Sequence, residues 1–298
     1  MKVGAILPIG TNKELGRPLS YPEIRDLALR VEDGGLDSVW IPDHLIYRFP
    51  EQPQAGVWEA WTITTGLAEA TKRIELGTLV ICVPFRNPAL VAKMAVTLDA
   101  VSGGRLILGL GAGWHKPEFD AFGYPFDHKV DRFEEALKII TPLVREGKVD
   151  FTGNYFSAPD CAMDPPPART IPVLVASRRP RMLRLTAEYA DSWNTAWLGQ
   201  VEALAASRGA MDEASKSVGR DPSTIEVTVG VNIGFADLMD LPETAADPKK
   251  FITGSIEDIA AGLRAYADAG VGHVIAWLYP QNGEAIDRLA QATKLARG

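Results

Sequence analysis

The chain has 298 residues, of which 46% are hydrophobic and 23% are charged, a composition typical of a globular protein whose core could enclose a ligand. Its formal net charge of −7 argues against nucleic acid or an anionic membrane surface as a partner. No apolar run approaches the roughly 20 residues of a membrane span, and the apolar N-terminus is too short for a secretory signal. We therefore expect a cytoplasmic protein.

Eight short β-type segments alternate with eight amphipathic helical segments along the whole chain. The expected strands are Val3–Ile9, Ser38–Pro42, Ile74–Val83, Arg105–Leu110, Ile171–Ala176, Asp191–Ala196, Ile225–Ile233 and His273–Leu278. The expected helices are Tyr21–Asp33, Trp58–Ala70, Pro88–Ala100, Lys129–Arg145, Arg181–Ala190, Val201–Val218, Ile256–Ala269 and Glu284–Ala296. Eight such repeats favour an α/β fold of the closed (β/α)8 TIM barrel type over an open doubly wound sheet. We predict a single domain over residues 1–298.

Two segments do not fit this repeat and predict insertions after the fourth helix and before the seventh helix. Val149–Ala168 indicates a short hairpin followed by a rigid, proline-rich excursion, and Phe235–Thr253 indicates a polar loop. Excursions of this length on barrels commonly form lids or partner contacts. The sequence leaves both roles open.

The second predicted strand ends in the residues IPDH, which contain Asp43 and His44. In a TIM barrel the active site is built at the C-terminal ends of the strands, so these side chains are expected at the mouth. A histidine there can exchange protons with a bound molecule near neutral pH. The alternative is that Asp43 caps the next segment and His44 lies on the surface, and position favours the functional interpretation.

The fourth predicted strand ends as LGLGAGWHKPEF, with Gly109, Gly111 and Gly113 alternating along it. Glycine weakens a strand unless another backbone or a ligand must come close, so this spacing indicates a flat ring system above the strand. The string nearly matches a dinucleotide-binding GxGxxG pattern. Because position 114 is Trp and no acidic residue follows at the expected distance, we reject a Rossmann fold.

The fifth predicted strand is followed by Ser177, Arg178, Arg179, Pro180 and Arg181 at the start of a helix. Arginines at the positive end of a helix are unfavourable unless an anion or acidic neighbours compensate them. Backbone N–H groups, Ser177 and the first two arginines could together bind a phosphate. The alternative is a solvated basic turn or an ion-pair network.

Other residues near strand ends are less specific. The aromatic residues could wall a dry cavity, but for each one taken singly the core is the more common position: Trp193, Trp197, Trp277 and Tyr279. Cys82 on the third strand could equally be a small buried apolar residue. The four histidines show no paired spacing, and the two cysteines lie in unrelated contexts. We therefore predict no metal site.

Three stretches together resemble the luciferase-like monooxygenase superfamily, in particular its F420-dependent oxidoreductase branch. They are DSVWIPDH, LGTLVICVPFRNPALVAKMAVTLDAVSGGRLILGLGAGWHKPEFDAFG from Leu76 to Gly123, and IPVLVASRRPRMLRLTAEYADSWN. The resemblance implies that the barrel mouth holds coenzyme F420 or FMN, with a non-prolyl cis peptide between Leu79 and Val80 behind the ring. The implied cofactor-binding residues are Asp43, His44, Leu79, Val80, Ile81, Gly111, Ala112, Gly113, Trp114, Ala176, Ser177, Arg178, Arg179 and Pro180.

The chain departs from relatives of this family at two places. Their phosphate loop is often glycine-rich, whereas this chain has Arg178 and Arg179, which suit the greater negative charge of F420 at least as well as FMN phosphate. The family's sugar-phosphate dehydrogenases have an acidic residue where this chain has Trp114, so that activity is disfavoured. His44, supported by His115 or Glu118, becomes the better candidate for proton transfer.

The leading hypothesis is hydride transfer between F420 and a small organic substrate, with His44 handling the accompanying proton. The alternative is an FMN-dependent monooxygenase supplied with reduced flavin by a separate reductase. A third possibility is a flavin- or F420-binding protein without turnover, because a barrel fold alone does not prove activity. The resemblance also implies a homodimer.

Overall fold

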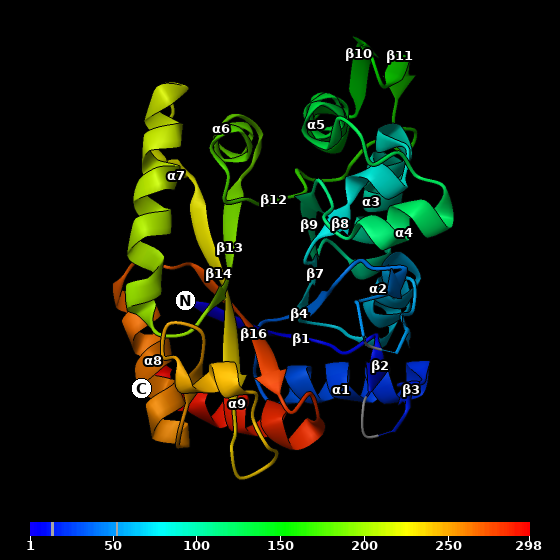
Figure 1. The fold of residues 1–298 in the computed structure, drawn as a ribbon. Helices are drawn as coiled ribbons and strands as arrows, with labels where there is room; N and C mark the ends of the chain where they lie inside the picture. Colours follow the sequence, from blue (N-terminus) through cyan, green and yellow to red (C-terminus); the bar gives the residue numbers. More distant parts are fainter. Residues whose placement is uncertain (13–14, 52) are drawn as a thin grey trace.

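Eight parallel strands close into a barrel in the computed structural model, which describes residues 1–12, 15–51 and 53–298 (Figure 1). The spatial order is β12-β13-β14-β16-β1-β4-β7-β9, and pairing of β12 with β9 closes the ring. This confirms the predicted barrel. The strands are β1 (Lys2–Ile6), β4 (Ser38–Ile41), β7 (Glu75–Thr78), β9 (Leu106–Gly111), β12 (Val173–Ala176), β13 (Ser192–Leu198), β14 (Glu226–Gly234) and β16 (His273–Tyr279).

Helices surround the strands on the outside of the barrel (Figure 1). The helices that connect successive barrel strands or follow the last one are α1 (Tyr21–Asp33), α2 (Ala60–Ala70), α3 (Pro88–Ser102), α5 (Lys129–Arg145), α6 (Pro180–Tyr189), α7 (Ala205–Ser217), α8 (Ile256–Asp268) and α9 (Gly283–Arg297). Helix α2 begins later than predicted because Glu59 serves as its N-cap and accepts hydrogen bonds from the N–H groups of Trp61 and Thr62.

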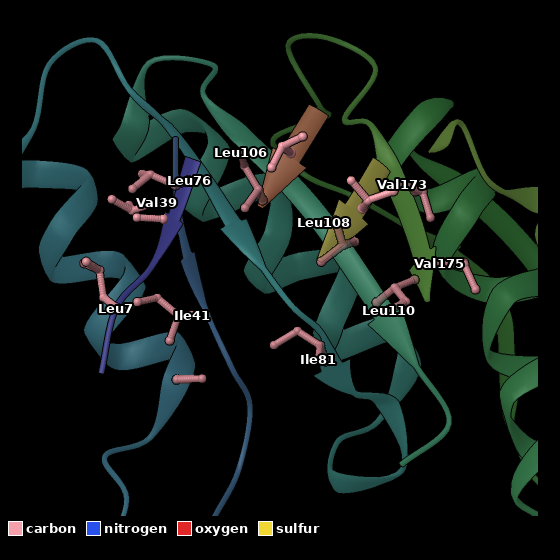
Figure 2. Close-up of a cluster of buried hydrophobic side chains, with 14 of the residues drawn as sticks. Leu7, Val39, Ile41, Leu76, Ile81, Leu106, Leu108, Leu110, Val173 and Val175 are labelled. Atoms are coloured by element: carbon pink, nitrogen blue, oxygen red, sulfur yellow. The ribbon is translucent and has the colours of Figure 1, made fainter. Parts of the chain in front are cut away.

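Alternate residues of several barrel strands belong to two different hydrophobic clusters. Leu106, Leu108 and Leu110 of β9 belong to the cluster that packs against the surrounding helices, and Figure 2 shows them beside Val173 and Val175 of β12. The intervening residues form a second cluster inside the barrel: Ile6, Trp40, Ile107, Leu174 and Ile275. This period-two division explains why the strands read as continuous apolar runs.

The third barrel strand is interrupted, so the prediction of one strand over Ile74–Val83 was wrong in its extent. β7 ends at Thr78, a cis peptide joins Leu79 to Val80 as the resemblance implied, and β8 (Ile81–Cys82) resumes pairing with β9. A Cβ atom at Gly109 would lie 1.9 Å from the Thr78 carbonyl oxygen, and one at Gly111 would lie 2.5 Å from Val80 Cγ2. The fourth-strand glycines therefore make room for this interruption.

The segment after α5 contains an antiparallel hairpin of β10 (Lys148–Thr152) and β11 (Ser157–Ala162), as expected. The segment before α8 is less irregular than predicted, because it includes a 3-10 turn at Glu243–Ala246 and β15 (Ile252–Thr253), which pairs with β14. The sequence analysis did not predict three features near the mouth: α4 (Lys116–Phe122), the β5–β6 pair (Ile46–Tyr47 with Ala55–Gly56) and the β2–β3 pair (Thr11–Asn12 with Arg17–Pro18). Within the described ranges, no helix combines the length and apolar character needed to cross a bilayer.

Candidate active site

Two adjoining cavities lie at the C-terminal ends of the barrel strands. The smaller cavity has a volume of about 360 Å³ and the larger one about 660 Å³, and both are lined by Pro42, Tyr47 and Trp277. The smaller cavity brings together eight of the predicted site residues: Asp43, His44, Leu79, Val80, Gly113, Trp114, Glu118 and Ala176. Its described lining does not include the other eight: Ile81, Gly111, Ala112, His115, Ser177, Arg178, Arg179 and Pro180.

His44 and Glu118 form a pair at the edge of the smaller cavity. His44 Nδ1 lies 3.0 Å from Glu118 Oε2, and Glu118 Oε1 also accepts a 2.6 Å hydrogen bond from the N–H of Leu45. Burial opposes ionisation of Glu118, but the hydrogen bonds from His44 and the backbone outweigh it and lower the pKa of this carboxyl. The carboxylate therefore fixes the orientation of His44, whose other ring nitrogen has no partner among the described residues.

His115 points elsewhere and connects two loops. Its Nε2 accepts a 3.2 Å hydrogen bond from the N–H of Arg48, and the residue is only 4% exposed. Burial lowers the pKa of His115, although the Glu118 carboxylate opposes this effect. A neutral ring accepting a backbone hydrogen bond holds the Arg48 segment against the loop before α4.

Asp43 is held in a buried ion-pair network rather than extending freely into the cavity. Its carboxylate accepts hydrogen bonds from Cys82 N at 2.9 Å and from Arg86 Nη1 at 2.6 Å. Arg86 also pairs with Glu59, the N-cap of α2, at 2.6 Å. Asp43 thus ties the end of β4 to β8 at the interrupted strand, which forms the floor of the smaller cavity.

The start of α6 carries two cations without partners. Within the described part of the chain, no hydrogen bond or ion pair joins the guanidinium group of Arg178 or Arg179 to another residue, whereas Arg181 pairs with Asp131 and Glu134. Ala176, directly before this turn, lines the smaller cavity. The buried Ser177 hydroxyl is committed to the Thr186 hydroxyl at 2.8 Å and is therefore not free for a ligand.

Aromatic rings cover the mouth. Trp114 is 60% exposed and lies edge-on to His44, with 5.7 Å between ring centroids, and it stacks on Phe49. Trp197 and Trp277 form a T-shaped pair with centroids 5.3 Å apart in the wall of the smaller cavity. Trp197 and Trp277 therefore line the cavity. Trp193 is instead a core residue, as the alternative interpretation held: it is fully buried, and its indole N–H donates to the Ser177 carbonyl.

Sequence reasoning missed three residues of the site. Arg86 follows the interrupted strand, and an arginine directly after the apolar residues VPF was the available signal for a buried ion pair. Tyr47 lies in the β5–β6 pair, which was not predicted. Asn194 lines the smaller cavity and donates to the Thr228 hydroxyl at 2.9 Å, and only its inward position on β13 reveals it. In the described ranges, no group of three His, Cys, Asp or Glu side chains could hold a metal ion.

Residues 1–254 match the sequence profile of the luciferase-like monooxygenase family. The chain belongs to this family. Membership agrees with the closed barrel, and the relatives of this chain include an F420-dependent dehydrogenase and monooxygenases.

Two curated relatives have different activities. The chain is 28% identical over 295 residues to an F420-dependent glucose-6-phosphate dehydrogenase from Kineococcus radiotolerans, covering 85% of this chain and 86% of that protein. It is 32% identical over 215 residues to the pyrimidine monooxygenase RutA from Enterobacter sp. strain 638, covering 69% of this chain. That alignment spans 57% of RutA, little more than half of its length.

Solved structures share the fold at lower sequence identity. An F420-dependent secondary alcohol dehydrogenase in complex with an F420-acetone adduct superposes with a TM-score of 0.83 at 20% identity, covering 100% of this chain and 99% of that chain. An EDTA monooxygenase from Chelativorans superposes with a TM-score of 0.80 at 14% identity, covering 100% and 94%. At these identities the likeness concerns the barrel fold alone.

Proposed function

We propose that the chain is an F420-dependent oxidoreductase that transfers a hydride between the cofactor and a small organic substrate at the barrel mouth. The observation that carries this proposal is the pair of unpartnered arginines, Arg178 and Arg179, at the start of α6 beside the smaller cavity. Unpaired cations at a helix N-terminus attract an anion. F420 carries a phosphodiester and an acidic tail, so it presents more negative charge there than FMN.

The described residues fit such a cofactor. A flat ring system would lie in the smaller cavity, whose floor is the interrupted strand at Leu79 and Val80 and whose walls include Trp197 and Trp277. Arg178 and Arg179 would bind the anionic part. When bound, F420 supplies hydride exchange with a substrate carbon, which is chemistry that the side chains themselves cannot perform.

The protein contributes orientation, proton transfer and exclusion of water. His44 is the proposed proton donor or acceptor, because its unpartnered ring nitrogen is the one left free for the cavity. Glu118 is a positioning residue that acts through His44, and His115 supports the same loop from outside the cavity. The aromatic cover at Trp114 and Trp197 limits water at the reacting atoms.

A second candidate is a two-component FMN monooxygenase with a separate reductase. The 32% identity to RutA over 69% of the chain favours it as the alternative. Reactivity with dioxygen separates the two: reduced FMN bound to the protein would consume oxygen in the presence of substrate, whereas reduced F420 would not. The homodimer and the single-domain organisation stay predictions, which sedimentation and limited proteolysis would test.

The experiment is a calorimetric titration of the purified protein with F420 and, separately, with FMN at low and moderate salt. We expect tighter F420 binding that weakens with salt and falls roughly tenfold or more in the Arg178→Ala/Arg179→Ala variant. The Arg181→Ala/Arg184→Ala variant is the matched control, because it removes two arginines that already have acidic partners. Preference for FMN would favour the monooxygenase. Binding of neither cofactor would overturn the proposal.

A further inference from the structure

We propose that the larger cavity binds an uncharged, largely apolar substrate that presents a carbonyl or hydroxyl oxygen, and that the Tyr47 hydroxyl donates a hydrogen bond to that oxygen. This inference rests on the proposed function, because it assigns the smaller cavity to the cofactor. It goes further by naming a substrate class and the side chain that recognises it.

Charge on the cavity walls disfavours an anionic substrate. The described lining of the larger cavity contains one carboxylate, Asp240, and no lysine, arginine or histidine. The described lining of the smaller cavity adds Asp43 and Glu118, again without lysine or arginine. An anion entering the larger cavity would lose hydration without meeting a lysine, arginine or histidine in the described lining, so its transfer from water is unfavourable.

The rest of the larger cavity is mainly apolar. Its walls come from the end of β1, the loop after β16 and the segment that precedes α8, and they include Leu7, Ile9, Met239, Leu241 and Leu278. A volume of about 660 Å³ lies within the range of pockets that enclose drug-sized molecules, roughly 300 to 1,000 Å³. The cavity therefore suits a molecule larger than the reacting group alone.

Tyr47 stands at the boundary between the two cavities, because it lines both. Its ring centroid is 4.5 Å from that of His44, and its hydroxyl has no hydrogen-bond partner among the described residues. Burial, reinforced by the nearby Glu118 carboxylate, raises the pKa of Tyr47 above its ordinary value. The phenol thus stays protonated and can donate to an uncharged oxygen.

These positions place substrate recognition and proton transfer together. An oxygen held by Tyr47 lies near His44, while the apolar remainder of the substrate extends into the larger cavity. A hydrogen-bond donor that lacks a protein partner gains most from a ligand that supplies an acceptor. A neutral ketone or secondary alcohol meets these requirements, and a sugar phosphate does not.

The test uses three probes with one skeleton: 4-phenylcyclohexanone, phenylcyclohexane without the oxygen, and the anionic 4-(4-oxocyclohexyl)benzoate. Dissociation constants are measured by ligand-observed NMR on the protein with oxidised F420 bound and on the cofactor-free protein, so no turnover is involved. Each probe is measured on wild type, Tyr47→Phe, Tyr279→Phe and Tyr124→Phe. Tyr279 also lines the larger cavity, whereas Tyr124 lines neither.

We expect the neutral ketone to bind at least tenfold more tightly than the benzoate. Tyr47→Phe should weaken ketone binding roughly three- to tenfold and leave phenylcyclohexane binding unchanged, as expected for loss of one hydrogen bond. Tyr124→Phe is the control and should leave all three constants unchanged.

Equal or tighter binding of the benzoate would overturn the substrate class. Weakening of the ketone by Tyr279→Phe instead of Tyr47→Phe would overturn the assigned donor, as would equal loss of the ketone and the hydrocarbon in Tyr47→Phe. If F420 fails to bind while the ketone pattern persists in the cofactor-free protein, the proposed cofactor is wrong and the recognition by Tyr47 stands.

Discussion

His273 and His44 lie at opposite ends of the barrel, and they differ in burial although each has one ring nitrogen in a side-chain hydrogen bond. His273 begins β16, and its Nε2 lies 2.8 Å from the Ser38 hydroxyl, which also accepts from Trp40 Nε1 at 2.8 Å. The residue is 1% exposed, and burial lowers the pKa of His273 to about 3. It is a neutral core residue, enclosed at the N-terminal ends of the strands.

His44 follows the C-terminal end of β4 and has one committed nitrogen. Glu118 holds Nδ1, while the side chain remains 14% exposed beside the smaller cavity. The two histidines have the same chemistry, but only His44 combines a fixed orientation with access to a ligand. The comparison shows that the end of the strand on which a residue lies, more than its type, decides whether its side chain is open to a cavity.

Removing the His44 ring should have the largest effect. We expect His44→Ala to lower F420-linked turnover of 4-phenylcyclohexanone by roughly 10²- to 10⁴-fold, the usual contribution of a general acid or base. Cofactor absorbance reports the rate, and the free energy of unfolding measured in urea serves as the control for folding. Full activity in this variant would mean that His44 is no more involved in catalysis than His273.

Among the variants compared for stability, Arg86→Met should lower the free energy of unfolding the most. Arg86 is the partner of Asp43, whose side chain is fully buried, and removing one member of a buried ion pair costs about 3 to 5 kcal/mol. Urea unfolding measures this loss. Lys116→Met is the matched control, because Lys116 and Asp120 form an exposed pair of little consequence. An equally small effect of both variants would contradict the role given to the network.

Two glycines allow close packing at the two ends. A Cβ atom at Gly109 would meet the Thr78 carbonyl near the mouth, and one at Gly4 would lie 1.9 Å from the Ser38 hydroxyl near His273. We expect each substitution to alanine to cost about 1 to 3 kcal/mol in unfolding free energy. Gly209→Ala, with open space around it, should be neutral or stabilising.

The variants Gly109→Ala and Gly4→Ala should both be destabilised, but they should differ in their affinity for F420. Calorimetry on the folded proteins should show weaker F420 binding for Gly109→Ala, because the floor of the smaller cavity must move. Gly4→Ala should bind F420 like wild type, because Gly4 lies at the opposite end of the barrel. Equal loss of affinity in both variants would show that the two ends are not independent.

The pH dependence of stability should carry the signature of His273. The pKa of His273 lies below its ordinary value of 6.5, so on acidification the unfolded chain takes up a proton before the folded one does. Stability contributed by the neutral buried ring is therefore lost as pH falls from 6.5 towards 3, by at most about 1.4 kcal/mol per pH unit.

The measurement is urea unfolding of wild type and His273→Gln near neutral pH and near pH 5. On acidification the free energy of unfolding should fall less in the variant than in wild type. The difference corresponds to the uptake of one proton, at most about 1.4 kcal/mol per pH unit. An identical pH dependence of the two proteins would contradict the assignment of a buried neutral histidine at this end of the barrel.

Local sequence patterns were sufficient to predict most helices and strands and to place part of the candidate site. The helices from Tyr21, Pro88 and Lys129 were predicted close to their observed bounds, because their apolar spacing and end signals are local. Asp43 and His44 could be placed at the mouth because they follow an identifiable strand. These inferences depend on a few consecutive residues and on the rule that barrel sites lie at strand ends.

By itself the sequence determined the eight-fold repeat, the barrel and the family, because periodicity and motif spacing are properties of the chain alone. Only the tertiary structure decided which side chains contact one another. The glycines of β9, which we had associated with a ligand, accommodate the interrupted strand, and Arg86 reaches Asp43 across 43 positions of sequence. Which polar groups are satisfied and which stay open, as at Tyr47, depends on contacts between distant segments that no local pattern encodes.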